Sequence, residues 1–138
     1  MTVIDAEAHV LGRLSSDVAQ RIMKGENVVI VNAEKALITG KKTKVFSDYK
    51  QKKDRGKIRK GPFYPRRADL ILKRTVRGMI PYRKPSGKEA YKRLKVFVGV
   101  PKEYQNASME TIEKAMSLTT SRYTTLGEVS KYLGSNVR

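Results

Sequence analysis

Lysine and arginine are the residues whose number and spacing could do chemistry in this sequence, and most of them lie in one segment. Residues 41–102 hold 22 of the 30 Lys and Arg residues and only four of the 13 Asp and Glu residues, an excess of 18 positive charges. The remainder of the chain is nearly neutral, so the whole protein carries a net charge of +17. Ammonium and guanidinium groups bind phosphate oxygens, and cations at this density repel one another unless an anion neutralises them. Residues 41–102, which we call the basic segment, therefore predict a polyanionic partner.

Aromatic rings are interleaved with these cations, at Phe46, Tyr49, Phe63, Tyr64, Tyr82 and Tyr91. A ring exposed among cations can stack on an unpaired nucleic-acid base, which contributes about 1–3 kcal/mol per base. We expect Phe46 to pack in the core, and we expect Tyr64 and Tyr82 to be exposed. The residues that this map predicts to contact a nucleic acid are Lys41, Lys42, Lys44, Lys50, Lys52, Lys53, Arg55, Lys57, Arg59, Lys60, Tyr64, Arg66, Arg67, Arg74, Arg77, Tyr82, Arg83, Lys84, Lys88 and Lys92.

Other chemistries have little support in the sequence. Cysteine is absent, which excludes disulfides, thiolate metal sites and cysteine nucleophiles. His9 is the only histidine, and beside the start of a predicted helix we interpret it as structural or RNA-contacting rather than catalytic. Residues 39–43 resemble a phosphate-binding P-loop only faintly, because that loop needs an earlier glycine and a hydroxyl directly after its lysine.

The sequence predicts neither a carboxylate-based active site nor a membrane-binding segment. Acidic residues lie near the ends of predicted elements, at Asp5, Asp17, Glu34 and Asp48, and no spacing singles out a pair for acid–base catalysis. A membrane helix would need about 20 apolar residues in a row, and a membrane-surface helix a broad apolar face, which residues 41–60 lack. We therefore predict a cytosolic protein with no enzymatic activity, no metal and no cofactor.

The first 31 residues predict a βαβ unit that can position the basic segment. Apolar side chains recur every three or four positions between residues 11 and 22, as in an amphipathic helix, and Gly25 is placed to end that helix. Residues 28–31 are all β-branched, which suits a strand covered on both faces. Together with the apolar pair at residues 3–4 they indicate two parallel strands joined by a right-handed crossover.

Downstream, the pattern predicts a short strand at residues 36–39, a helix at 41–53 and an extended loop at 55–67. A helix from Ala68 to Met79 should end at Gly78 and Pro81, and residues 85–87 should form a loop before a short helix at 89–93. A core strand at 96–98 precedes a weakly patterned stretch, residues 104–121, with a helical turn near Ile112 and Met116. The motif Thr-x-x-Glu at residues 125–128 predicts a capped helix that ends at Gly134.

Several stretches resemble one protein family in order and spacing. The string LGRLSS at residues 11–16 is similar to the LGRLAS segment of the L-thirteen family of large-subunit ribosomal proteins. VRGMIP at 76–81, GK at 87–88 and LKVFVG at 94–99 resemble its central signature, and YTTLGE at 123–128 resembles the C-terminal pattern of archaeal and eukaryotic members. VPKEY at 100–104 is similar to that branch, and the long helical extension of eukaryotic members is missing, which indicates an archaeal-type member.

The resemblance implies one domain, residues 1–138, with a three-layer α/β/α fold, a parallel sheet of about four strands and a basic extended loop. It implies a cytoplasmic, structural part of the large ribosomal subunit, with ribosomal RNA and other large-subunit proteins as partners and no small-molecule substrate. In bacterial relatives it implies an early place in assembly. Because the family's motifs lie there, it adds Arg13 and Gly78, beside Arg77, to the predicted contacts.

Two other functions remain open from the residues alone. A sequence-tolerant DNA-compacting protein would show no preference for folded ribosomal RNA and would have the steep salt dependence of duplex DNA binding, about −0.9 per phosphate neutralised. A small RNA-processing enzyme would lose turnover when one carboxylate is changed, without losing binding. Shape and phosphate geometry should dominate recognition of RNA, because its major groove is too narrow for side chains.

Overall fold

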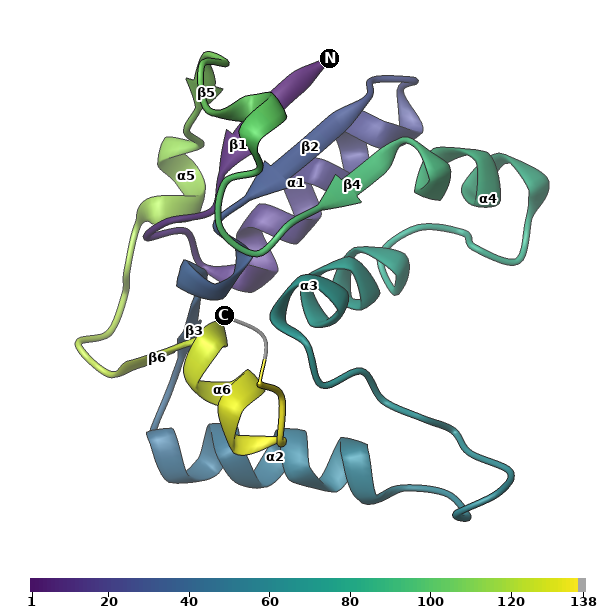
Figure 1. Cartoon of the computed structure of the whole chain (residues 1–138), viewed down its shortest axis with the longest axis vertical. Helices are drawn as coiled ribbons and strands as arrows, with labels where there is room; N and C mark the ends of the chain where they lie inside the picture. The colour runs from purple at the N-terminus through teal and green to yellow at the C-terminus, as the bar shows by residue number, and fades with distance from the viewer. Residues whose placement is uncertain (137–138) are drawn as a thin grey trace.

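A four-stranded parallel sheet forms the centre of the molecule. The computed structural model describes residues 1–136 and places the strands in the order β4-β2-β1-β5 (Figure 1). The strands are β1 (Thr2–Asp5), β2 (Val28–Val31), β4 (Leu94–Val96) and β5 (Met109–Glu110), and every neighbouring pair is parallel. The predicted α/β class with a parallel sheet of about four strands is confirmed.

The predicted βαβ unit is present at the N-terminus. Helix α1 (Leu11–Met23) connects β1 to β2, and its apolar residues are buried in the spacing that the sequence predicts. Gly25 follows with φ +99°, the left-handed conformation that commonly ends a helix. All four residues of β2 are buried, as its continuous β-branched sequence predicts for a strand covered on both faces.

Helices cover one face of the sheet. Ile4, Val28 and Ile30 lie in the main core together with buried residues of α1, α3 (Ala68–Arg77) and α4 (Pro85–Lys92). Because side chains alternate along a strand, the neighbouring residues of β1 and β2 point to the other face.

A shorter segment covers that other face. Val3, Val29 and Val31 pack with Tyr104, which is the last residue of the short 3₁₀ helix η2 (Lys102–Tyr104). The sheet is therefore enclosed between layers, a thick one of helices and a thin one built from the chain between β4 and β5. Among the described residues, no helix is long and apolar enough to cross a membrane.

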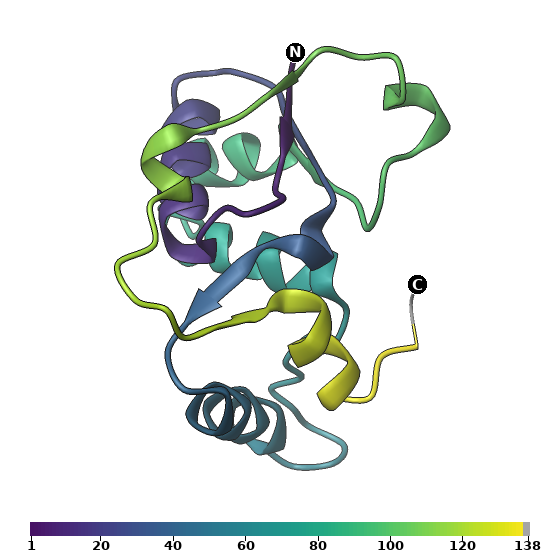
Figure 2. The same ribbon diagram turned by 90° about the vertical axis from the view of Figure 1, so that its left-hand side faces the viewer.

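A second, smaller sheet holds the base of the basic segment. Strand β3 (Leu37–Thr39), which follows the 3₁₀ turn η1 (Ala33–Lys35), pairs antiparallel with β6 (Tyr123–Thr125). Helix α6 (Leu126–Tyr132) follows β6 directly, and helix α2 (Lys42–Asp54) packs on both, away from the main sheet (Figures 1 and 2).

The predicted cap of α6 is confirmed. The backbone N–H of Glu128 donates to the Thr125 hydroxyl at 3.3 Å, and Gly134 lies just beyond the helix with φ +99°. The helical turn predicted near Ile112 and Met116 is α5 (Glu113–Met116).

Three sequence predictions differ from the structure. The predicted loop at residues 85–87 is the first turn of α4, where proline is favoured because the first helical N–H needs no partner within the helix. Strand β4 starts and ends two residues earlier than predicted, so Phe97 and Val98 follow it rather than belong to it. The strands β5 and β6 were not predicted, since each is three residues or shorter and gains its identity only by pairing.

Candidate nucleic-acid interface

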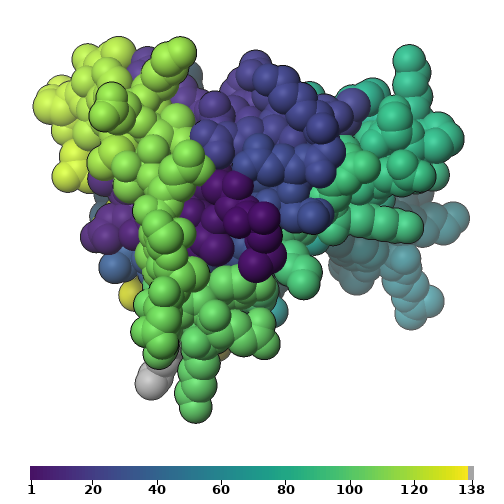
Figure 3. All heavy atoms as spheres, turned by 90° about the horizontal axis from the view of Figure 1, so that it is seen from above, coloured from purple at the N-terminus to yellow at the C-terminus, as the bar shows by residue number. Residues whose placement is uncertain are grey.

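The basic segment spreads over three connected surfaces of the fold. Helix α2 and the loop at residues 55–67 project from the body of the molecule, and α3 and α4 continue the segment along one side of the core (Figure 1). Seen from above, the teal-green residues of this segment lie at the right of the view, beside the purple and blue residues of the βαβ unit, and the yellow-green residues lie at the opposite side (Figure 3). The chain thus separates its cations from its nearly neutral remainder.

Helix α2 has a narrow buried face and a broad cationic one. Val45 and Tyr49 are buried, and the half-buried ring of Phe46 stacks on Tyr132 of α6, with 4.5 Å between ring centroids. This confirms that Phe46 packs rather than faces a ligand. Lys53 is half-buried. The other lysines of the helix and its N-cap are exposed: Lys41, Lys42, Lys44, Lys50 and Lys52.

The extended loop predicted at residues 55–67 is confirmed, and all six of its cations are exposed: Arg55, Lys57, Arg59, Lys60, Arg66 and Arg67. Its far end is tied to the body, because the Ser130 hydroxyl of α6 donates to the Arg66 carbonyl at 2.7 Å. Near this end Tyr64 meets Tyr49 edge to face, with 6.2 Å between ring centroids. The loop therefore runs across the surface from α2 to α3 with its charges facing solvent.

The third surface is formed by α3, α4 and the connection between them. Arg74 and Arg77 are half-buried, and the Arg77 guanidinium lies 4.9 Å from the centre of the Tyr82 ring. Gly78 is exposed and caps α3 with φ −67°, so it needs no special backbone freedom there. The remaining predicted contacts are exposed: Arg83, Lys84, Lys88 and Lys92.

Two of the predicted contact rings are less exposed than expected. Tyr64 and Tyr82 are both half-buried and pack against the main core, Tyr82 also meeting Tyr91 edge to face at 5.3 Å. The sequence showed only that these rings stand among cations. It could not show that Tyr49 and Tyr91 would cover them from the core side.

The two residues that the sequence singles out in the N-terminal part, His9 and Arg13, lie in different surroundings. His9 is fully buried; its Nε2 accepts from the backbone N–H of Ile112 at 2.9 Å, so Nδ1 carries the proton and donates to the Glu7 carbonyl at 2.9 Å. This confirms its structural role and removes it from any RNA-contacting surface. Arg13 is exposed, and one of its guanidinium nitrogens donates to the Ser117 carbonyl at 2.6 Å.

The cations of the basic segment are largely uncompensated. Within residues 1–136, only Lys42 and Arg67 among its 22 Lys and Arg residues form ion pairs, to Glu128 at 3.8 Å and Asp69 at 3.1 Å. The buried phenols do not supply negative charge either, since burial raises the pKa of Tyr49 to about 12 and also raises the pKa of Tyr64. The segment thus presents a strong positive field to an anionic partner.

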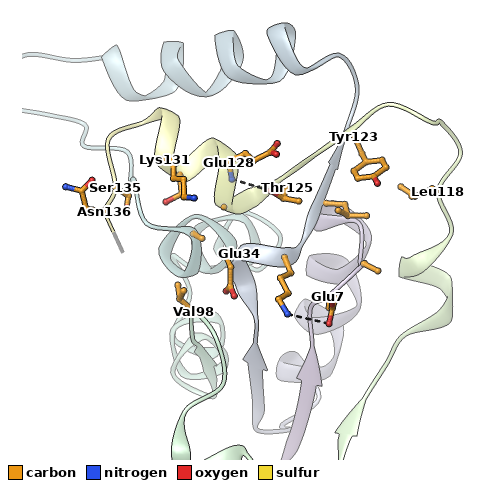
Figure 4. A pocket seen from close by; sticks show the side chains of 16 residues that line it. Glu7, Glu34, Val98, Leu118, Tyr123, Thr125, Glu128, Lys131, Ser135 and Asn136 are labelled. Atoms are coloured by element: carbon orange, nitrogen blue, oxygen red, sulfur yellow. Dashed lines mark hydrogen bonds and ion pairs between the residues drawn. The ribbon is translucent and has the colours of Figure 1, made fainter. Parts of the chain in front are cut away.

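An open groove of about 1330 Å³ lies between α6, the β3–β6 pair and the turn after β1 (Figure 4). Its three carboxylates already have partners: Glu34 accepts from the Gly99 N–H at 2.9 Å, Glu7 lies 3.7 Å from Lys35, and Glu128 pairs with Lys42. In the part of the chain that the structure describes, no three His, Asp or Glu side chains could hold a metal ion together.

Comparison with known proteins decides the family. The model of the family "Ribosomal protein L13" matches residues 1–103. The chain belongs to this family. It is 55% identical over 136 residues to the "Large ribosomal subunit protein uL13" of Archaeoglobus fulgidus, a match that covers 96% of this chain and 87% of the relative.

Other archaeal relatives agree with this family assignment. The proteins of the same name from Methanococcoides burtonii and Methanopyrus kandleri are 50% and 51% identical. These matches cover 98% and 96% of this chain, and 99% and 86% of the relatives. The resemblance to an archaeal-type member, inferred from short strings such as VPKEY at residues 100–104, is confirmed over nearly the full chain.

Proposed function

We propose that this protein is a structural constituent of the large ribosomal subunit that binds and stabilises folded large-subunit ribosomal RNA. The observation that carries the proposal is the basic segment itself, in which all but two of 22 cations lack an ionic partner within residues 1–136. Folded ribosomal RNA brings phosphates from several helices close together, and such a surface offsets their repulsion. The names of the archaeal relatives point to the same assembly.

The fold supports a division of labour in this binding. The parallel sheet with α1 forms a rigid base, while α2, the loop at residues 55–67 and the α3–α4 connection offer cations on separate surfaces. Cations on several surfaces can hold more than one RNA helix at once, which fixes a junction in one arrangement. We propose that this is how the protein contributes to assembly, beside other large-subunit proteins in the cytoplasmic ribosome.

The use of the polar core residues supports a structural rather than an enzymatic role. Both ring nitrogens of His9 form hydrogen bonds with backbone groups, and the Glu34 carboxylate accepts a hydrogen bond from the Gly99 N–H. Phosphate contacts of exposed lysines and arginines position an RNA but do not read its bases. Recognition should therefore depend on the shape of the folded RNA.

A competition titration tests the proposal. The purified protein is bound to protein-free large-subunit ribosomal RNA from its own source at several salt concentrations, with duplex DNA of equal nucleotide amount as competitor. We expect the RNA to retain the protein at physiological salt and the DNA to fail to displace it. Equal competition at every salt concentration would contradict the proposal and favour a DNA-compacting protein.

A further inference from the structure

The tip of the loop at residues 55–67 exposes two large apolar side chains. Ile58 is 97% exposed and Phe63 is 75% exposed, the two most exposed large hydrophobic side chains within residues 2–136. Four cations lie within the same short stretch, namely Arg55, Lys57, Arg59 and Lys60. No Asp or Glu occurs between Asp54 and Asp69. Exposed apolar side chains that have only cations as charged neighbours in the sequence favour a partner that carries both negative charge and apolar surface.

The tip is a closed turn and not an open strand of chain. The Lys57 N–H donates to the Gly61 carbonyl at 3.2 Å, and the Gly61 N–H donates back to the Lys57 carbonyl at 3.0 Å. Gly56 has φ +91°, and a Cβ there would lie 2.2 Å from the Gly61 carbonyl oxygen, so only glycine fits. The backbone therefore holds Ile58 at the end of a preformed turn.

The Phe63 ring is seated on this turn. A Cβ at Gly61, which has φ +67°, would lie 3.1 Å from the Phe63 Cδ2 and Cε2 atoms. The glycine thus leaves room for the ring, which rests beside the backbone on one side and is open to solvent elsewhere. Tyr64, the next residue, turns instead toward Tyr49 and the core.

The other rings of the basic segment are already occupied. Phe46 stacks on Tyr132, Tyr82 meets Tyr91, and the Tyr49 and Tyr64 rings meet each other. Phe97 is half-buried and packs against Tyr104. Among the described residues of the segment, Phe63 is therefore the aromatic side chain that is most free to receive a planar ligand.

We infer that Phe63 stacks on an unpaired base of the ribosomal RNA, while Ile58 packs beside it and the four cations of the tip bind the adjoining phosphates. This inference rests on the proposed function and narrows its partner to an RNA site with at least one unstacked nucleotide. In a continuous duplex the base faces are covered by their neighbours, so the open ring would have nothing to stack on. Each base has a π-face, so such a contact reads shape and strand state more than sequence.

Binding of Phe63 variants to protein-free large-subunit RNA tests the inference. Phe63→Leu keeps an apolar side chain and removes the aromatic face, so we expect binding about 10-fold weaker. The salt dependence should stay unchanged, because no charge is lost. Phe63→Tyr keeps the ring and should bind like the wild type. Equal binding by the leucine variant, or an equal loss in the tyrosine variant, would overturn the inference.

Chemical probing of the same complexes locates the contact. With a reagent that modifies unpaired bases, we expect at least one base that the wild-type protein protects and Phe63→Leu leaves reactive; no such base would count against stacking. If the wild-type protein does not prefer the RNA to duplex DNA, the proposed function fails. If it does prefer the RNA and Phe63→Leu changes neither affinity nor protection, only the stacking inference fails.

A protein partner is the competing occupant of the tip. In that case Phe63→Leu would bind protein-free RNA like the wild type but would be retained less well in assembled large subunits. That pattern would overturn the inference and assign Ile58 and Phe63 to an interface with another protein.

Discussion

The N-terminal βαβ unit and the basic segment use positively charged side chains in opposite ways. In the βαβ unit, the Arg21 guanidinium lies 2.7 Å from Asp17 and 2.8 Å from Glu110, and so joins α1 to the edge strand β5. Burial lowers the pKa of Arg21, but its bonds to Glu110 and Asp17 outweigh this effect and raise that pKa. In the basic segment most cations have no such partner within residues 1–136. A paired cation stabilises the fold, whereas an unpaired one remains available to an anionic ligand.

The largest effect that separates the two regions is expected from a core truncation. Ile30 of β2 is fully buried, so Ile30→Ala should lower the free energy of unfolding by about 4 kcal/mol, through lost burial and the cavity left behind. Ile58→Ala makes the same chemical change at a 97% exposed position and should alter stability by less than about 0.5 kcal/mol. Urea unfolding of both variants measures the difference. Similar losses would mean that the loop tip belongs to the folded core.

Removal of charge should break the comparison in the other direction. Replacing Lys52, Lys53, Arg55 and Lys57 with alanine should leave folding nearly intact and weaken RNA binding about 100-fold, with a salt slope shallower by about 3. The matched control removes four exposed lysines outside the segment: Lys24, Lys35, Lys114 and Lys131. It should bind almost like the wild type. Loss of the circular dichroism signal in the first variant would refute the division into core and binding surface.

A smaller effect is expected from the pH dependence of stability, through Tyr49 on the buried face of α2. Burial raises the pKa of Tyr49 to about 12 from an ordinary value of 10.0, so the folded state holds this proton more tightly. The resulting stability is complete below pH 10 and is lost as the pH rises to 12. Between pH 7 and pH 11, the free energy of unfolding of Tyr49→Phe should therefore fall by about 1 kcal/mol less than that of the wild type.

Thermal unfolding of both proteins at pH 7 and pH 11 measures this effect. The difference between them should grow at pH 11 in favour of the phenylalanine variant. An unchanged difference would show that α2 opens without exposing its buried ring.

The smallest effect is expected from Arg21, the paired cation of α1. Arg21→Ala should lower the free energy of unfolding by about 1 kcal/mol, because its carboxylate partners are partly exposed to solvent. Amide hydrogen exchange should quicken in β5, the strand that Arg21 ties to α1. Binding to ribosomal RNA should keep its salt slope. A slope as shallow as that of a basic-segment variant would mean that Arg21 also meets phosphate.

The sequence predicted those parts of the fold that depend on local pattern. The helical spacing from Leu11 to Ile22 and the β-branched run at β2 are local signals, and both elements were found as predicted. Strand β5 has two residues, and nothing in Met109 or Glu110 indicates a strand until β1 pairs with it. The sequence around Pro85 does not distinguish a loop from the first turn of a helix, because proline both ends and begins helices. Only the packing of Gly87 against Pro81 distinguishes the two.

The charge of the candidate interface was readable from the sequence, but the exposure of its rings was not. Cation density is a property of composition and survives any arrangement of the elements. Which ring faces solvent depends on partners far along the chain, as Tyr132 is for Phe46. The sequence therefore favoured Tyr64, and the structure draws attention to its neighbour Phe63.

The pairing of β3 with β6 also sets an order of events during synthesis. The two strands lie on either side of the whole basic segment, and α2 packs mainly on β6 and α6. A chain made at about 5–20 residues per second needs roughly 4–14 s to extend from Asp54, the last residue of α2, to Thr125. During that time α2 has been synthesised, but β6 and α6, on which it packs, have not. A nascent chain that stops before β6 therefore displays its cations without the platform that arranges them.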